Sequence, residues 1–370
     1  MNNKSNNLAI VGGGIIGLSI GWQLLRRGVP VTLYEKDEIG QHTSRVAAGM
    51  LAPYAEVGFE EVEIMELGQK SLQLYPRFLD ELSEDSSSVP HLDRCGTLLV
   101  GIDRDDTEHL SRLYNFRKEL NLKVEMMTGT EAREREPLLS PNVVSGVWLP
   151  DDGQIDNRQL LKSLKEAFLN RGGTLKENAK VTRVHAEHGT CTGITTEEKY
   201  IKHDSVVITA GPWTGDIETP ASKLGIRPVK GQILTLQKTQ ECDPSTIIRS
   251  PRMYLVPKEN GTLRLGATSE EQGFNTEITA GGMKELLEDG WEVVPSIYDL
   301  PIEEMIAGLR PSSRDHAPVI GESEIENLYY ATGHFRNGIL LTPVTVYNLI
   351  NYILDRQPSQ ILHLCKPDRF

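Results

Sequence analysis

Apolar and polar positions at the start of the chain follow patterns that predict a strand, a helix and a second strand. Residues 8–11 (LAIV) form an apolar run long enough for one buried strand. Apolar side chains then recur every four residues, at Ile16, Ile20 and Leu24, which predicts a helix that stops at Gly28. Residues 31–34 form a second apolar run, which ends at Glu35. The segment therefore predicts two buried strands joined by an amphipathic helix.

The turn between the first strand and the helix carries Gly12, Gly14 and Gly17 in the spacing G-x-G-x-x-G. In dinucleotide-binding folds the first glycine allows a tight turn, the second lets the backbone approach a pyrophosphate, and the third lets helix and strand pack closely. The helix N-terminus offers N–H groups to the phosphate, and Glu35 is placed to accept hydrogen bonds from ribose hydroxyls. These parts in this order predict a site for FAD or NAD; the alternative is a glycine-rich turn that binds nothing.

A loop of small residues follows where another strand–helix unit would continue an NAD domain. Residues 40–52 (GQHTSRVAAGMLA) show little periodicity. The hydroxyls of Thr43 and Ser44 are suited to bonding phosphate, and residues 47–50 leave the backbone bare enough for a flat ligand to lie against it. A ligand-binding loop is favoured over an ordinary linker.

The rest of the chain mixes helical and strand patterns. Helices are predicted over residues 56–82, 106–120, from 157 to 172, within 281–295, and from 342 to 353. Asn157 and Thr342 are expected as N-caps, and Pro343 as a first-turn proline. Strands are predicted over residues 97–102, 144–149, 181–184, 191–195, 200–203, 205–210, 227–236, 253–268 with a turn at 259–261, 303–311, 317–321 and 328–332. The run 205–210 (SVVITA) ends in Gly211, which is typical of a buried parallel strand that meets a ligand at its carboxyl end.

The predicted helix over residues 56–82 is acidic near its start. Its carboxylates are Glu56, Glu60, Glu61, Glu63 and Glu66. A metal cluster is one interpretation, but a solvated helix face is favoured, and no metal site is expected.

Composition limits the classes of partner. A formal net charge of −13 argues against nucleic acid, which requires an excess of Lys and Arg on some face. The four cysteines contain no C-x-x-C pair, which suits a reducing cytoplasm and gives neither a zinc site nor a disulfide framework. The 370 residues are enough for two domains.

No membrane segment or export signal is expected. The uncharged stretches 8–25 and 337–354 are interrupted by glycines or by Asn, Thr and Pro, so neither is a good candidate for a bilayer span. The start MNNKSNN lacks the layout of a secretory signal. The expected location is the cytoplasm.

Across nearly its whole length the chain resembles the D-amino-acid oxidase-like FAD-dependent oxidoreductases, and within them the members that oxidise glycine for thiamine thiazole synthesis. The motifs that carry the resemblance are HTSRVAAGMLAP (42–53), RPVKGQIL (227–234), YLVPKENGTLRLGATSEEQGF (254–274), IAGLRPSSRDHAPVIG (306–321), ATGHFRNGILLTPVT (331–345) and PDRF (367–370). Two positions depart from the family's usual pattern, Ile306 where Trp is common and His316 near a usual Gly. These departures bear on the substrate more than on the cofactor.

The resemblance implies an α/β fold, α+β overall, with a Rossmann-like FAD-binding domain and a second, antiparallel-sheet substrate domain. The FAD-binding domain is expected to be discontinuous, over residues 1–85, 145–215 and 305–370. The substrate domain is expected over residues 86–144 and 216–304. Antiparallel sheet edges leave a homo-oligomer plausible.

The resemblance also implies the residues that contact FAD. Together with the glycine motif and Gly211, they are Ile15, Ile16, Glu35, Lys36, Thr43, Ser44, Ala48, Gly49, Met50, Val181, His334, Phe335, Arg336, Asn337, Gly338, Ile339 and Leu340. Relatives that attach flavin covalently use a cysteine, and none lies within residues 308–321, so FAD is expected to be noncovalent.

Family members remove hydride from the α-carbon of an amino acid, and the reduced flavin passes its electrons to O₂. The expected substrate is glycine or another small amine (sarcosine, D-alanine, D-proline), with an imine or 2-oxo acid, ammonia and H₂O₂ as products. This chemistry depends on positioning, because the cofactor supplies the difficult step.

Three side chains are expected to act on the substrate. Arg310 matches the family's carboxylate-binding arginine, whose planar fork suits a carboxylate, although an arginine before a proline is commonly a surface ion-pair partner. Tyr254 matches the hydroxyl that assists it; the alternative is a cross-strand aromatic. Arg336 is expected at the pocket mouth or as a partner of acidic surface groups. His334 is expected to be structural rather than a general base.

Two other functions compete with the oxidase. One is a D-amino-acid dehydrogenase of the same fold that passes electrons to a quinone or another acceptor, but no basic amphipathic helix supports membrane docking. The other is a non-catalytic dinucleotide-binding module, which the net charge disfavours if nucleic acid is its partner.

Overall fold

The computed structural model describes residues 7–56, 58–197, 199–357, 359 and 363–370. The predicted N-terminal strands, β1 (Leu8–Val11) and β2 (Val31–Tyr34), are neighbours in a six-stranded sheet of order β19-β20-β13-β1-β2-β9. The remaining strands are β9 (Thr174–Lys176), β13 (Ser205–Ile208), β19 (Val319–Glu322) and β20 (Leu328–Thr332). Every pairing is parallel except that of β19 with β20. The prediction of a buried parallel strand within residues 205–210 is confirmed, and the strand ends at Ile208.

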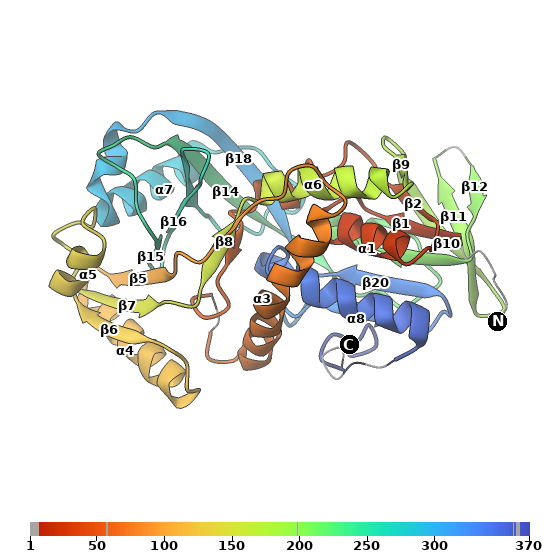
Figure 1. The fold of residues 1–370 in the computed structure, drawn as a ribbon, viewed down its shortest axis with the longest axis horizontal. Coiled ribbons are helices and arrows are strands. Elements are labelled where there is room, and N and C mark those ends of the chain that lie inside the picture. The colour runs from red at the N-terminus through yellow and green to blue at the C-terminus, as the bar shows by residue number, and fades with distance from the viewer. Residues whose placement is uncertain (1–6, 57, 198, 358, 360–362) are drawn as a thin grey trace.

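Both faces of this sheet are covered, which explains why the central strand is apolar throughout. Leu8 and Ile10 pack into a core shared with a layer of helices, whereas Ala9 and Val11 pack against a three-stranded antiparallel sheet. The helices are α1 (Ile15–Arg26), α3 (Val62–Ser83), α6 (Asn157–Asn170) and α8 (Thr342–Asp355), and Figure 1 shows α1, α6 and α8 on one side of the sheet. The small sheet consists of β10 (Val181–Glu187), β11 (Thr190–Thr196) and β12 (Tyr200–Lys202).

An eight-stranded sheet forms the other half of the molecule. Its order is β18-β14-β17-β16-β15-β5-β7-β6, and all pairings are antiparallel except that of β15 with β5. The strands are β5 (Thr97–Gly101), β6 (Glu125–Thr128), β7 (Ser145–Leu149), β14 (Arg227–Gln237), β15 (Ile247–Arg249), β16 (Tyr254–Pro257), β17 (Thr262–Gly266) and β18 (Ile302–Ser312). The helices on this half are α4 (Arg104–Glu119), α5 (Gly129–Arg135) and α7 (Ala280–Val293).

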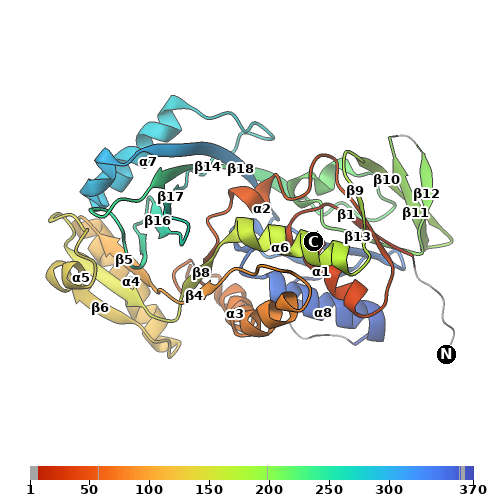
Figure 2. The same cartoon turned by 45° about the horizontal axis from the view of Figure 1, so that its top comes forward.

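Two long strands join the halves. β14 and β18 pair along nearly their whole lengths, and Figure 2 shows them running from α7 toward α2 (Thr43–Val46). A short sheet of β3 (Met50–Leu51), β8 (Gly153–Ile155) and β4 (Leu92–Asp93) makes a second junction. The short 3-10 helices are η1 (Gly211–Asp216), η2 (Pro295–Asp299) and η3 (Phe335–Asn337).

A division by sheets differs from the expected domain boundaries in two places. β7 and β18 pair within the eight-stranded sheet, whereas residues 145–149 and 305–312 were expected with the FAD-binding segments. A strand belongs to the sheet whose backbone it pairs with, and strand composition does not identify that partner.

Several helix starts differ from their predictions. The acidic helix begins at Val62 rather than at residue 56. The cap of α6 is Asp156, whose side chain accepts from the backbone N–H groups of Arg158 and Gln159, so Asn157 is not the cap. Thr342 is the first residue of α8 rather than its cap, whereas Pro343 does lie in the first turn. Within the described residues, no helix combines the length and apolarity needed to cross a bilayer.

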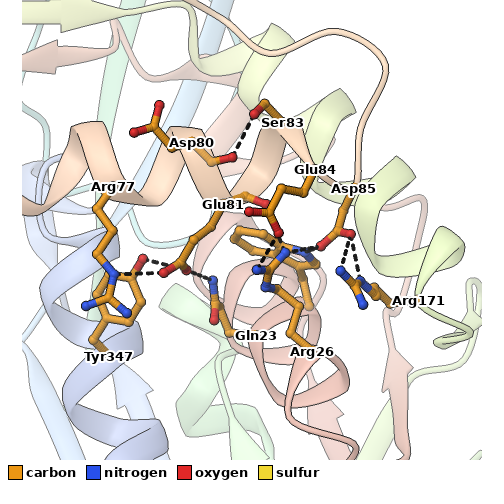
Figure 3. Close-up of polar contacts among 11 residues, drawn as sticks. Gln23, Arg26, Arg77, Asp80, Glu81, Ser83, Glu84, Asp85, Arg171 and Tyr347 are labelled. Atoms are coloured by element: carbon orange, nitrogen blue, oxygen red, sulfur yellow. Dashed lines mark hydrogen bonds and ion pairs between the residues drawn. The ribbon is translucent and has the colours of Figure 1, made fainter.

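Two carboxylates, the half-buried Glu81 of α3 and the buried Asp85 just after it, connect this helix to its neighbours (Figure 3). Glu81 accepts hydrogen bonds from Arg77, Gln23 and Tyr347. Asp85, whose side chain is 5% exposed, lies 2.7 Å from Arg26 and 2.6 Å from Arg171 and also accepts from the Trp22 indole at 2.8 Å. Burial alone would raise the pKa of Asp85, but its hydrogen bonds to Arg171, Trp22 and Arg26 bring that pKa below its ordinary value.

Asp85→Asn is therefore expected to destabilise the protein by about 2–4 kcal/mol at pH 7, because Arg171 loses its counter-charge and Arg26 keeps only its ion pair with Glu84. A lowered folded-state pKa adds stability above the unfolded pKa, and this contribution is lost as the pH falls through the folded value. The difference in unfolding free energy between wild type and variant should therefore shrink from pH 7 to pH 3.5 in urea titrations. Asp80→Asn is the control, since the Asp80 carboxylate points away from the network in Figure 3. Equal stability of wild type and Asp85→Asn at pH 7 would contradict the assignment.

Candidate active site

One cavity of about 730 Å³ extends from the N-terminal glycine turn to the eight-stranded sheet. Its wall includes the ends of β1, β2 and β13, the loop around α2, strands β14, β16 and β18, and the segment that precedes α8. The carboxyl ends of parallel strands β1, β2 and β13 open at one edge of the six-stranded sheet, where α/β folds bind their ligands. The cavity therefore lies where the two halves meet.

The glycine turn has the geometry that its spacing predicts. Gly12 has φ +114°, and a side chain there would place its Cβ 2.6 Å from the Thr209 carbonyl oxygen. Gly17 packs so closely that a Cβ would collide with the Gly12 carbonyl and lie 2.6 Å from Thr209 Oγ1. Gly12 thus forms the turn, and Gly17 permits the close contact of helix and strand.

The N-terminus of α1 faces this cavity without a side-chain cap. Gly14 is the cap residue and makes no side-chain hydrogen bond. The backbone N–H of Ile15 donates to Ser44 Oγ at 3.0 Å, and Ser44 keeps its own hydroxyl proton for another acceptor. The Thr43 hydroxyl instead donates to the Leu309 carbonyl at 2.6 Å. Of the two hydroxyls expected to bind phosphate, Ser44 is the one with a proton available.

The loop that carries Thr43 and Ser44 is held by hydrogen bonds from residues on its other side. Asn157, which was expected only as a helix cap, donates its amide to the carbonyls of Ser44 and Arg45 at 2.8 and 3.1 Å. The Lys258 ammonium lies behind Gly49 and donates to Gln154 Oε1 and the Ile155 carbonyl at 2.9 and 3.1 Å. Burial lowers the Lys258 pKa to about 7. Residues 47–50 therefore form a fixed wall with little side-chain bulk.

Glu35 and Lys36 lie at the far end of the cavity. Glu35 accepts from the Gly13 N–H at 2.7 Å through Oε2 and from the Asp37 N–H at 3.2 Å through Oε1. Each carboxylate oxygen keeps a further lone pair, so Glu35 remains able to accept from a ribose. The Lys36 ammonium lies 4.1 Å from the ring centre of Trp213, a cavity residue that no sequence pattern identified.

Arg310 lies at the sheet end of the cavity, on β18. Its Nη1 donates to the carbonyls of Thr268 and Lys230 at 3.1 and 3.4 Å, and within the described residues it forms no ion pair. The guanidinium lies against Gly231 of the neighbouring strand, where a Cβ would be 2.5 Å from Nη2. Arg310 is therefore a half-buried cation whose position depends on a glycine, and it is not the surface ion-pair partner that its sequence context favours.

Tyr254 is placed in the same way. It pairs across the sheet with Gly266, and a Cβ on Gly266 would be 2.6 Å from the Tyr254 hydroxyl. Burial raises the pKa of Tyr254 to about 12 although Arg310 opposes the rise, so the phenol stays protonated at neutral pH and is able to donate. Arg310 and Tyr254 both line the cavity.

The segment before α8 supplies the remaining wall. Arg336 lines the cavity and forms an ion pair with Glu61 at 2.6 Å. It therefore lies at the cavity and also has an acidic partner, the two positions considered for it from the sequence. His334 is 3% exposed and lies 3.0 Å from Thr345 Oγ1, and burial lowers its pKa to about 3. His334 is therefore neutral and forms part of the wall, as expected of a structural histidine.

Most of the expected cofactor-binding residues meet at this cavity. Those on its wall are Gly12, Gly14, Ile15, Ile16, Glu35, Lys36, Thr43, Ser44, Ala48, Gly49, Met50, Val181, Gly211, His334, Phe335, Arg336, Gly338 and Ile339. Gly17, Asn337 and Leu340 lie outside the wall. Leu340 packs into the helix-side core, and its carbonyl accepts from the Ser71 hydroxyl at 2.6 Å.

Two carboxylates that the sequence placed on a solvated helix face instead form ion pairs with arginines of the cavity wall. Glu56 was predicted on a solvated helix face, but it precedes α3 and pairs with Arg249 at 2.7 Å. Glu61, assigned to the same face, pairs with Arg336. That interpretation is therefore wrong for these two carboxylates, because the helix starts after them and each pairs with an arginine of the cavity wall.

The comparisons with known proteins agree with this geometry. The profile of the family described as "DAO: FAD dependent oxidoreductase" matches residues 7–346. A glycine oxidase from Geobacillus kaustophilus is 31% identical over 342 residues, which cover 92% of this chain and 90% of that protein. A crystal structure of glycine oxidase from the same organism superposes with a TM-score of 0.92 at 29% identity and covers 99% of both chains.

A second group of relatives is longer. A "Bifunctional protein ThiO/ThiG" from Synechocystis sp. is 32% identical over 372 residues, which cover 99% of this chain but 54% of that protein. The chain therefore spans about half the length of these bifunctional relatives.

Proposed function

We propose that this chain, which belongs to the DAO family of FAD-dependent oxidoreductases, oxidises glycine or another small amine at its α-carbon. The observation that carries the proposal is the single cavity that joins the dinucleotide motif to Arg310 and Tyr254. One end has the parts that hold a dinucleotide, and the other has a guanidinium and a phenol suited to a carboxylate.

The residues present fit FAD. The uncapped N-terminus of α1, with the Ser44 hydroxyl beside it, suits the pyrophosphate, and Glu35 suits a ribose. The wall formed by residues 47–50 is bare enough for a flat ring system. When bound, FAD supplies the two-electron acceptor for the substrate and passes those electrons to O₂.

The protein's own groups bind and orient the substrate. Arg310 has N–H groups free to grip both oxygens of a carboxylate, and the protonated Tyr254 hydroxyl donates to the same group. Gripping the acid end fixes where the α-carbon lies, and such positioning is the main contribution that this reaction requires from a protein. The α-carbon loses hydride and the amine loses a proton to give an imine. Water then converts the imine to a 2-oxo acid and ammonia, while O₂ becomes H₂O₂.

The first test is anaerobic mixing of the purified yellow protein with glycine, sarcosine, D-alanine and D-proline in parallel. We expect glycine or sarcosine to bleach the flavin absorbance and air to restore it with formation of H₂O₂. A protein that no amine bleaches would overturn the proposal. Slow recovery in air, with fast recovery on adding a quinone, would identify a dehydrogenase instead.

The cellular role follows from the longer relatives. Since the bifunctional ThiO/ThiG proteins contain a region similar to this whole chain, we propose that the imine supplies thiamine thiazole synthesis. A reducing cytoplasm is the proposed compartment, which the unpaired Cys95, Cys191, Cys242 and Cys365 support. A strain that lacks this protein should then need added thiamine to grow.

A further inference from the structure

We propose that Glu56, held in place by Arg249, receives the amino group of the substrate while Arg310 and Tyr254 hold its carboxylate. This inference rests on the proposed function and adds a specificity-determining residue to it. No sequence motif pointed to Glu56 or Arg249, and both line the cavity with Arg310 and Tyr254.

The Glu56 side chain is largely buried, and among the described residues only one of its two carboxylate oxygens has a hydrogen-bond partner. Its side chain is 8% exposed, and Oε1 accepts from Arg249 Nη1 at 2.7 Å. The other oxygen, Oε2, has no hydrogen-bond partner among the described residues. Because Glu56 lines the cavity and this oxygen has no donor from the described residues, Oε2 is suited to accept an N–H from a ligand.

Two buried charged residues, Asp152 and Arg117, hold the backbone just before Glu56. The Tyr54 N–H donates to Asp152 Oδ1 at 3.1 Å, and Arg117 Nε donates to the Tyr54 carbonyl at 2.7 Å. Asp152 is 0% exposed and Arg117 is 2% exposed. The Glu56 N–H closes the turn on the Ala52 carbonyl at 3.1 Å. The loop is therefore anchored from the interior, and Glu56 is presented to the cavity at a fixed place.

The charges at this end of the cavity match a small amino acid. Arg310, Glu56 and Arg249 are all close enough to the Tyr254 hydroxyl to influence its ionisation. The Arg249 guanidinium offsets the charge of the Glu56 carboxylate and fixes its position. Arg310 forms no ion pair among the described residues and is available for the substrate carboxylate. A site with one free cation and one free acceptor oxygen selects ligands that carry both an acid and an amine.

The proposal predicts different effects on ligands with and without an amine. Glu56→Gln should raise the KM for glycine about 10- to 100-fold, since it removes a charge-assisted hydrogen bond. The inhibition constant of acetate, which has the carboxylate but no amine, should stay within about twofold. If Glu56 had only a structural role, the variant would change the glycine KM and the acetate inhibition constant together, or it would change neither.

Three variants make the test decisive. Glu60→Gln is the matched control, because Glu60 is an exposed carboxylate of the same loop, and it should change neither constant. If Glu56→Gln does not retain FAD, Glu56→Asp keeps the charge, and it too should raise the glycine KM while sparing acetate. Arg249→Lys keeps a cation beside Glu56 and should retain most of the selectivity.

The outcomes separate this inference from the proposed function. A wild-type protein that never oxidises glycine refutes the proposed function, and the Glu56 inference with it. A wild-type protein that oxidises glycine, together with a Glu56 variant of unchanged glycine KM, refutes the Glu56 inference alone. Parallel changes in the glycine and acetate constants also refute it.

Discussion

Arg310→Ala is expected to lower kcat/KM for glycine by roughly 10²- to 10³-fold, which is the usual cost of removing one partner from a buried, hydrogen-bonded charge pair. The guanidinium forms no ion pair among the described residues, so its loss leaves the substrate carboxylate without a counter-charge in the cavity. Stopped-flow reduction by glycine measures the effect directly, and the visible spectrum of the variant shows whether FAD is still bound.

Two further variants define the role of Arg310. Arg310→Lys keeps the charge but not the planar fork, and it should recover only part of the loss. Arg227→Ala is the control: Arg227 lies on the neighbouring strand β14, is largely exposed and pairs with Glu271 outside the cavity wall. Unchanged reduction kinetics in Arg310→Ala would refute the proposal that Arg310 binds the substrate carboxylate.

Gly12→Val is expected to abolish FAD binding, so that the protein purifies colourless and is inactive. Position 12 has φ +114°, which a β-branched residue does not adopt without strain, and a Cβ there would meet the Thr209 backbone at 2.6 Å. The turn must therefore move, and the N-terminus of α1 moves with it. The FAD content of the purified protein and its thermal unfolding with and without added FAD measure the effect.

A variant at a second glycine distinguishes the effect of backbone strain from that of a steric collision of the new side chain. Gly28 also has a positive φ, +79°, but a Cβ there would meet nothing within 4 Å. Gly28→Ala should therefore cost only about 1 kcal/mol of stability and leave FAD bound. A colourless Gly28→Ala protein, or a yellow Gly12→Val protein, would show that the collision at position 12 is not what matters.

Both proposed substrate-binding side chains pack against a glycine. Arg310 lies against Gly231, and Tyr254 lies against Gly266, each on a neighbouring strand. The missing side chains leave room for a guanidinium and a phenol to lie along the sheet. The family resemblance pointed to the two anchors, but only the strand register identifies the glycines that place them.

What the sequence by itself determined is the local part of this protein. The G-x-G-x-x-G turn, the helix after it and the strand before Glu35 lie within about thirty residues. Their backbone conformation and packing depend on residues within that segment, so the local sequence is enough to predict them. The buried strand before Gly211 was equally visible, because a strand covered on both faces is apolar throughout.

Only the tertiary structure decided which distant side chains share the cavity. Glu56 looked like one of several carboxylates on a solvated helix, yet it pairs with Arg249, and Asn157 looked like a cap, yet it holds the loop at Ser44. Strand pairing between remote segments and the burial of charges depend on how the two sheets pack together. A local sequence pattern contains no information about this packing. The same physical reason explains why β7 and β18 belong to the eight-stranded sheet.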